Sequence, residues 1–568
     1  MKKLINDPRS VVPDMLEGLA TLHPGHALLE GENVVLRSDL PPLPERRGVA
    51  LISGGGAGHE PAHAGYVGAG MLSAAVTGEV FTSPGTDAVL AAIRAVAGAD
   101  GVLLIVKNYT GDRLNFGLAA ELARGEGIAV ELVVVADDVA LRDTVEAGRR
   151  RGVAGTVLVH KVAGAAAAAG LPLAEVAREA REAAAAVGTM GVALGACTVP
   201  AAGRAGFTLG EDEIELGLGI HGERGVRRTT LEPAAAIVGT ILETILSDAA
   251  IAAGEQVALL VNGLGGTPPM ELAIVAAEAI AQLRARGVHV ARAWSGNLLT
   301  ALEMPGCSLS VMRLDALRLQ RLDAPTSAPA WPRGGVLAER VARTAAPHAS
   351  VTAAELFRND HGQGRAVRDA ALAIAAALEA EERQLTELDS IAGDGDLGIS
   401  MARGAAAVRE IPPAAWSSAA AGLAAMSEAL RRAIAGSSGP FYATALLRAA
   451  RSLGACDPVT PGDWASAFDL GVSGVSDLGG ARPGDRTMLD ALRPAADALS
   501  SAIAAGRPFR VALSAMLEAG ERGAEATAAM NPRLGRAAYL GDRAAGVPDA
   551  GAAAVVVWLR ALERHLAG

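Results

Sequence analysis

The sequence is poor in cysteine, and this shortage excludes two kinds of structural support. The 568 residues include three cysteines, Cys197, Cys307 and Cys456. They are odd in number, far apart and in no CxxC pair, so they predict neither a disulfide framework nor a structural zinc site. A few unpaired cysteines are typical of the reducing cytoplasm, which is the location that we expect.

Aromatic residues are also scarce, at 3% of the chain, although hydrophobic residues make up 51%. Much of the apolar share is alanine, which predicts closely packed helices. No apolar run approaches the roughly 18 residues of a membrane span. The early Asn6, Asp7 and Pro8 do not fit a signal peptide. We therefore expect no membrane association.

Lysine is almost absent, because only Lys2, Lys3, Lys107 and Lys161 accompany the arginines. The net charge is −11 and no extended basic patch is present, so we expect no nucleic-acid partner. In so arginine-rich a chain, an internal lysine indicates a position that needs a compact ammonium group. Lys107 lies in a motif discussed below.

The first part of the chain alternates short apolar runs with helical patterns. This alternation predicts an α/β domain over residues 1–325, with two α/β subdomains over about 1–185 and 186–325 and largely parallel sheets. A helix over Ala163–Gly188 is expected to separate them. The expected strands are Gly48–Ile52, Gly101–Val106, Val130–Val135, Gly155–Val159, Gln256–Val261 and Val288–Ala291.

The second part of the chain has a different pattern. The prolines at 329 and 332 predict a proline-rich linker over residues 326–349. Beyond it, apolar residues recur at helical period and predict an all-α domain over residues 350–568. The expected helices are Ala366–Leu388, Ile399–Val408, Trp416–Ala435, Thr487–Ala505, Arg510–Met530 and Ala552–Leu566.

Three carboxylates, Asp389, Asp394 and Asp396, lie within eight residues between two expected helices. Anions this close repel unless a cation or protons neutralise them, and hard oxygen ligands suit Mg²⁺. The simpler interpretation is a solvated acidic loop. An EF-hand is excluded, because its ligands at positions five and twelve are missing. We expect a Mg²⁺ site that is open to phosphate oxygens.

Three loops of the α/β part carry polar residues. The first, Ser53–Pro61, is a glycine-rich turn after an expected strand, where ligands of α/β sheets gather, and it includes His59. The second, Lys107–Phe116, offers the ammonium of Lys107 and the carboxylate of Asp112. The third, Gly217–Gly225, presents His221 between glycines as a nucleophile or base. Tight packing, a helix-capping Asp112 and an ordinary surface histidine are the alternatives.

These segments resemble the dihydroxyacetone kinase family. The matching motifs of the first part are SGGGAGHEPAHAGYVG, AVTGEVFTSP, KNYTGDRLNFGLA, GTMGVAL, ELGLGIHGE and LVNGLGGTP. Those of the second part are LDSIAGDGDLG, AGSSGPFYATAL, ARPGDRTMLDALRPA and GRAAYLGDRAAGVPDAGA. The resemblance implies a dihydroxyacetone-binding domain followed by a nucleotide-binding domain that is an antiparallel helical barrel.

The resemblance also implies roles for individual residues of the first domain. His221 matches the histidine that captures the substrate carbonyl as a covalent hemiaminal. His59 and Asp112 match the acid/base pair of the family. The residues that match the lining of the substrate pocket are Gly56, Ala57, Gly58 and Lys107.

In the second domain, Asp389, Asp394 and Asp396 match the metal-binding aspartates of the family. The positions that match nucleotide contacts are Leu397, Ser400, Ser437, Ser438, Gly479, Thr487, Met488, Asp549 and Gly551. The sequence departs from the family pattern at Ala57, Leu397, Ala538 and Ala550. In the family, serine is usual at the positions of Ala57 and Ala538, and proline at that of Ala550. The position of Leu397 often holds histidine or cysteine.

The implied activity is ATP-dependent phosphorylation of dihydroxyacetone with Mg²⁺, by a homodimer. A kinase for another small ketose or aldose, such as erythrulose or glyceraldehyde, is the first alternative. A lyase that cleaves FAD to cyclic FMN and a sensor without turnover are the others. Some relatives receive phosphate from a phosphotransferase protein. The fused halves and the lack of a following phosphocarrier domain favour free ATP here.

Overall fold

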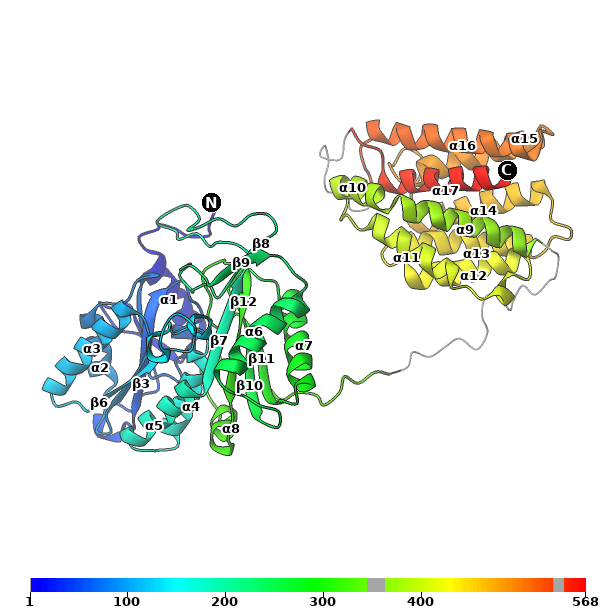
Figure 1. Cartoon of the computed structure of the whole chain (residues 1–568). Helices are drawn as coiled ribbons and strands as arrows, with labels where there is room; N and C mark the ends of the chain where they lie inside the picture. The colour runs from blue at the N-terminus through cyan, green and yellow to red at the C-terminus, as the bar shows by residue number, and fades with distance from the viewer. Residues whose placement is uncertain (1, 345–362, 535–545, 568) are drawn as a thin grey trace. The chain divides into compact units, whose positions relative to one another are not determined.

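The chain folds into two compact units, residues 1–342 and 343–568. The computed structural model describes residues 2–344, 363–534 and 546–567. The first unit combines strands and helices, and the described residues of the second form helices only (Figure 1). This confirms the predicted order of an α/β half and an all-α half. Among the described residues, no helix is long and apolar enough to cross a membrane.

The first sheet of the α/β unit is largely parallel, as predicted. Its strand order is β1-β2-β4-β3-β5-β6, and the pairs β4-β3, β3-β5 and β5-β6 are parallel. The carboxyl ends of β3 and β5 therefore meet at one edge of the sheet. The strands are β1 His26–Leu28, β2 Val34–Arg37, β3 Ala50–Ala57, β4 Ala74–Val80, β5 Val102–Lys107 and β6 Val130–Val135.

The second sheet is mainly antiparallel, so the prediction of a largely parallel sheet was wrong for it. Its order is β11-β10-β12-β7-β8-β9, and only the β10-β11 pair is parallel. Four of these strands, β7, β8, β9 and β12, were not predicted. The six are β7 Val187–Ala193, β8 Glu213–Leu216, β9 Arg227–Thr230, β10 Gln256–Gly263, β11 His289–Gly296 and β12 Gly306–Arg313.

The two sheets share one core, and a buried helix contributes to it from the middle of the unit. This helix, α4 (Thr156–Ala168), begins where a strand was predicted over Gly155–Val159, so that prediction was wrong. The Asp137 carboxylate accepts the N–H groups of Val153 and Gly155 at 2.7 and 2.8 Å and fixes the start of α4. Because α4 is buried on nearly every side, its apolar run has no helical period to distinguish it from a buried strand.

Helices complete the first unit, and two of them explain the expected helix between the subdomains. The segment Ala163–Gly188 contains the end of α4 and all of α5 (Leu173–Ala185). The others are α1 Val11–Leu22, α2 Thr86–Val96, α3 Thr110–Gly125, α6 Ala234–Asp248, α7 Pro269–Ala285 and α8 Ala316–Asp323.

The segment predicted as a linker starts as part of the first unit. The N–H of Ala330 donates to the carbonyl of Gly65 at 2.9 Å. Trp331 is 9% exposed, and its ring lies 4.9 Å from that of Trp294. The N–H of Ala293 in β11 donates to the carbonyl of Gly335 at 2.9 Å. Residues 326–335 are therefore not a linker, because a tryptophan anchors them in the core.

Replacing Trp331 with alanine is expected to lower the free energy of unfolding of the first unit by about 3 kcal/mol, because it removes a large buried ring. The measurement is urea unfolding of the full chain, followed by circular dichroism in the range where strands contribute. Arg333→Ala is the control, because the side chain two residues away is exposed. Equal stability of the two variants would mean that the segment contributes nothing to the core.

The second unit is a closed ring of helices around an apolar interior. Each helix packs on the next from α11 to α17, and α9 packs on both α17 and α11, which closes the ring. A cavity of about 380 Å³ inside it is lined almost wholly by apolar side chains. This arrangement confirms the helical barrel. Its helices are α9 Gly364–Ala380, α11 Leu397–Arg409, α12 Ala419–Ala433, α13 Ser438–Leu453, α14 Pro461–Gly479, α15 Leu489–Ala504, α16 Phe509–Ala526 and α17 Ala550–Ala567, with α10 Glu382–Ala392 beside it.

Candidate active site

The three polar loops of the first unit meet at one place. His59 follows β3, and His221 follows β8 in the other sheet. Their Nε2 atoms lie 3.1 Å apart, and their ring centroids are 4.9 Å apart. Residues 162 positions apart in the sequence are thus in direct contact.

His59 is fully buried, and its orientation is fixed from both sides of the ring. Its Nδ1 lies 2.8 Å from the carbonyl oxygen of Thr300. A carbonyl oxygen only accepts, so Nδ1 carries a hydrogen. Burial, together with the charges of Lys107 and His221, holds the pKa of His59 well below its usual value.

His221 lies at the tip of a turn and contacts Glu223 through two hydrogen bonds. Its Nδ1 is 2.9 Å from Glu223 Oε1, and its backbone N–H donates to Glu223 Oε2 at 3.0 Å. Burial opposes the ionisation of Glu223, but its hydrogen bonds with His221, the charge of His221 and its own backbone together lower its pKa to about 2. Sequence analysis missed Glu223, although it stands in the quoted motif ELGLGIHGE.

Lys107 and Asp112 are buried next to the glycine-rich strand. A side chain built at Gly55 would place its Cβ 3.2 Å from Lys107 Nζ and 3.8 Å from Asp112 Oδ2. Burial lowers the pKa of Lys107, and the carboxylate of Asp112 opposes that shift. Among the described residues, no group hydrogen-bonds to Asp112 Oδ1. No side chain caps α3, so the helix-capping interpretation of Asp112 fails.

The predicted pocket residues Gly56, Ala57 and Gly58 form the end of β3 and the turn after it. A Cβ at Gly56 would collide with the backbone of Phe81 and Thr82. Gly58 has φ +96°, where a side chain would be strained and would also meet the ring of Phe81. These glycines are therefore required by close packing against Phe81, whatever else they bind.

Two aromatic rings enclose the histidine pair, and sequence reasoning assigned neither of them. Phe81 stacks on His59 with centroids 5.1 Å apart and meets the edge of His221 at 5.2 Å. Tyr109 contacts His221 at 4.7 Å. Phe81 has φ +59°, a strained conformation for a bulky residue, and such strain is concentrated at functional sites. Because aromatic residues are scarce in this chain, Phe81 and Tyr109 could have been singled out from the sequence.

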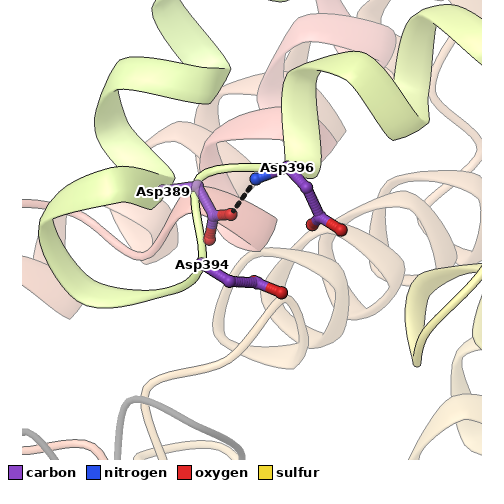
Figure 2. Close-up of side chains that lie close together, drawn as sticks. All are labelled: Asp389, Asp394 and Asp396. Carbon is purple, nitrogen blue, oxygen red and sulfur yellow. Dashed lines mark hydrogen bonds between the residues drawn. The ribbon is translucent and has the colours of Figure 1, made fainter. Parts of the chain in front are cut away.

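The three predicted metal ligands converge in the second unit (Figure 2). Asp389 lies in the last turns of α10, and Asp396 directly precedes α11. One carboxylate oxygen of each of the three aspartates lies within 4.8 Å of the others. Asp389 Oδ2 also accepts the N–H groups of Asp396 and Leu397 at 3.0 and 3.2 Å, which fixes the loop. Three hard oxygen donors around one point fit Mg²⁺.

The predicted nucleotide contacts near this loop lie at the starts of helices. Leu397 and Ser400 are on the first turn of α11 and are both buried. Ser437 and Ser438 are at the start of α13, where unpaired N–H groups favour phosphate. Leu397 and Ala550 belong to one buried cluster with Ile434, which precedes α13. The cluster brings the starts of α11, α13 and α17 together.

Thr487, Met488 and Asp549 lie just before α15 and α17, and Gly551 is the second residue of α17. A Cβ at Gly551 would be 3.0 Å from Asp549 Oδ2 and 3.5 Å from the Cβ of Met488, so these three residues adjoin. Thr487 donates its N–H to Asp490 at 2.8 Å. Burial, together with the nearby carboxylates of Asp490 and Asp389, raises the pKa of Asp549 to about 6, although the hydrogen bond from Ala552 and the charge of Arg486 oppose the shift.

Gly479 and Ala538 are the remaining positions of the second unit that were named from the sequence. Gly479, at the end of α14, packs against the ring of Phe441. Ala538 lies outside the described residues.

Comparison with known proteins identifies both units. Residues 17–330 match the family model of the Dak1 domain, and residues 391–564 match that of the DAK2 domain. The chain is 44% identical to the triokinase/FMN cyclase of Homo sapiens, over 99% of this chain and 98% of that protein. It is 38% identical to the D-erythrulose kinase of Mycolicibacterium smegmatis, with the same shares covered.

Solved structures of the dihydroxyacetone kinase of C. freundii also match, in the native form and in complex with AMP-PNP and Mg²⁺. Each is 35% identical, covers 99% of both chains and has a TM-score of 0.64. The protein is a kinase built from fused Dak1 and Dak2 domains. It belongs to the dihydroxyacetone kinase family.

Proposed function

We propose that the protein transfers the terminal phosphate of ATP to dihydroxyacetone and makes dihydroxyacetone phosphate. The observation that carries the proposal is the contact between His221 and His59 in a unit that also buries Asp112 next to Lys107. An imidazole nitrogen can add to a ketone or an aldehyde but has nothing to attack in glycerol. A nucleophilic His221 therefore selects carbonyl substrates.

The first unit binds the acceptor in this proposal. His221 Nε2 adds to the carbonyl carbon and forms a hemiaminal, which holds the sugar in one position and converts transfer into a step within a bound complex. His59 and Asp112 are the acid/base pair, and one of them takes the proton of the hydroxyl that attacks phosphorus. Lys107 and the backbone of Gly56, Ala57 and Gly58 line the pocket.

The second unit binds the donor. Asp389, Asp394 and Asp396 would hold Mg²⁺, and the N–H groups at the start of α13, with Ser437 and Ser438, would hold phosphate oxygens. When bound, Mg²⁺ neutralises charge on the phosphates during transfer. Leu397, Ser400, Gly479, Thr487, Met488, Asp549 and Gly551 would contact the rest of the nucleotide. The complex of the C. freundii relative with AMP-PNP and Mg²⁺ supports this assignment.

Another small ketose is the second candidate substrate, since one relative is named as a D-erythrulose kinase. One methylene group is worth only about 1–3 kcal/mol of discrimination, so the same site could accept either sugar. The deciding experiment measures ATP consumption with Mg²⁺ for dihydroxyacetone, glyceraldehyde, erythrulose and glycerol. No turnover with any carbonyl sugar would refute the kinase proposal. Formation of cyclic FMN from FAD would show that the protein has the lyase activity in addition to the kinase activity.

Asp112→Asn is expected to lower kcat by about 10²- to 10⁴-fold, because an amide cannot take the hydroxyl proton. The change keeps the shape of a side chain that is only 3% exposed, so folding should be preserved. Turnover of dihydroxyacetone at saturating ATP is the measurement. Asp87→Asn on α2, an exposed aspartate, is the control. If Asp112→Asn had the kcat of the wild type, Asp112 would not be the base, and His59 would have that role.

A further inference from the structure

The turn that carries His221 is folded so that Glu223 reaches back to it. Gly219 donates its N–H to the carbonyl of Glu223, and Gly222 donates to the carbonyl of Gly219, both at 3.0 Å. This closed turn places the Glu223 side chain against the His221 ring, with one oxygen on Nδ1 and the other on the backbone N–H. Both oxygens of the Glu223 carboxylate therefore form hydrogen bonds with the same residue, His221.

Behind this turn, Arg151 anchors the preceding backbone. Its Nε donates to Asp138 Oδ2 at 2.8 Å, and its Nη2 donates to the carbonyl of Gly217 at 2.7 Å. A Cβ at Gly219 would collide with both Glu223 Oε2 and Arg151 Nη1, so a glycine is needed there for Glu223 to keep its place. The position of Glu223 is therefore built into the loop.

We propose that Glu223 is a positioning residue that holds the hydrogen of His221 on Nδ1 and so leaves Nε2 available to attack the substrate carbonyl. The inference rests on the proposed function. A carboxylate only accepts hydrogen bonds, so the ring nitrogen that faces it carries the hydrogen. Free imidazole side chains favour the opposite tautomer, in which the hydrogen blocks Nε2.

The same reasoning accounts for the contact between the two histidines. Thr300 and Glu223 place hydrogens on Nδ1 of His59 and of His221. In a neutral pair, two Nε2 lone pairs would then face each other at 3.1 Å. A hydrogen bond across that contact therefore requires one additional proton between the Nε2 atoms, with Glu223 as its counter-charge, and this proton must pass to His59 before His221 Nε2 can attack.

This proton completes the addition step. His221 Nε2 forms a bond to the carbonyl carbon, the C=O π electrons move to oxygen, and that oxygen takes the proton from between the two rings through His59. His221 is left as an N-substituted imidazolium that still carries its Nδ1 hydrogen. The Glu223 carboxylate balances its charge, so no atom or charge is left over.

The test compares Glu223→Gln with the wild-type full chain. The carboxylate of Glu223 accepts two hydrogen bonds from His221, but a glutamine side chain has only one acceptor oxygen. When that oxygen accepts the backbone N–H of His221, the NH₂ group of the glutamine faces Nδ1. The Nε2-H tautomer is then favoured, and kcat/KM for dihydroxyacetone is expected to fall by up to about 10⁴-fold, the loss in kcat that a wrong histidine tautomer causes. Gly219→Ala, which retains Glu223 but displaces it, should act in the same direction.

Two measurements separate a tautomer effect from general damage. Nitrogen NMR of selectively ¹⁵N-histidine-labelled protein, without sugar, reports which nitrogen of His221 carries the hydrogen. Carbon NMR with [2-¹³C]dihydroxyacetone reports the hemiaminal. We expect the hydrogen on Nδ1 in the wild type, its transfer to Nε2 in Glu223→Gln, and a matching loss of adduct. Glu213→Gln, which removes a charge from a partly exposed position on β8, should change neither signal.

Retention of the Nδ1 hydrogen and of the full adduct in Glu223→Gln would overturn the inference. If that variant does not fold, Gly219→Ala decides by the same two signals. Should the wild type form no adduct with any carbonyl sugar, the proposed function fails. The tautomer measured without sugar still decides the role of Glu223 in that case.

Discussion

His221→Ala is expected to lower kcat/KM for dihydroxyacetone by at least about 10⁴-fold, because it removes the atom that would hold the sugar covalently. Correct positioning of a reacting group contributes up to about 7–11 kcal/mol to lowering a barrier. Here the sugar is small and offers few other contacts, so covalent capture would supply most of that positioning. The measurement is ATP-dependent turnover of dihydroxyacetone with Mg²⁺, together with adduct detection by ¹³C NMR.

The control for this variant is His289→Ala, the same substitution at an exposed position of β11. It should retain wild-type turnover and adduct. Glycerol provides a second control, because it has no carbonyl group. If His221→Ala still phosphorylated dihydroxyacetone at the wild-type rate, covalent capture would be refuted, although a kinase without it would remain.

The individual loops of this site could be predicted because each follows a recognisable strand or lies between glycines. Strand β3 is an apolar run that ends in glycines just before His59, and β5 is an apolar run that ends at Lys107. Their pairing in a parallel sheet brings His59 near Lys107. The contact of His59 with His221 could not be derived from the sequence alone. It depends on how the mainly antiparallel second sheet packs on the first through α4.

The missed residues are those whose role depends on packing. Thr300 holds His59 through a backbone carbonyl, so its residue type gives no signal. Phe81 is strained because the backbone of Gly56 and the ring of His59 lie against it. Trp331 appeared to lie in a linker because prolines surround it in the sequence. Only the tertiary structure shows that its ring has a partner in Trp294.

In the second unit the helical period predicted most helices, but it joined α9 and α10 into one helix over Ala366–Leu388 and missed α13 and α14. Both are interrupted by glycines, such as Gly439 and Gly471, which lower helix propensity in sequence analysis. The structure explains these glycines by close packing. A Cβ at Gly439 would collide with the carbonyl of Ile434. A Cβ at Gly471 would lie 3.0 Å from the carbonyl oxygen of Ala445. Tertiary contacts therefore outweigh local propensity in these two helices.

Asp396→Asn is expected to lower kcat by about 10²- to 10³-fold and to raise the Mg²⁺ concentration needed for half activity, because it replaces a charged metal ligand with a neutral one. Asp396 suits the test better than Asp389, since Asp389 Oδ2 also holds two backbone N–H groups of the loop. The Asp396 side chain makes no capping hydrogen bond to α11, so asparagine should leave the helix intact.

Activity measured across a Mg²⁺ titration, and again after chelation, separates metal binding from folding. Asp477→Asn is the control, because this exposed carboxylate pairs with Arg448 at the surface, where an ion pair contributes little to stability. We expect excess Mg²⁺ to restore part of the activity of Asp396→Asn, since two of the three carboxylates remain. An unchanged Mg²⁺ dependence in that variant would mean that the acidic loop is only a solvated turn, and that the phosphates are bound elsewhere in the second unit.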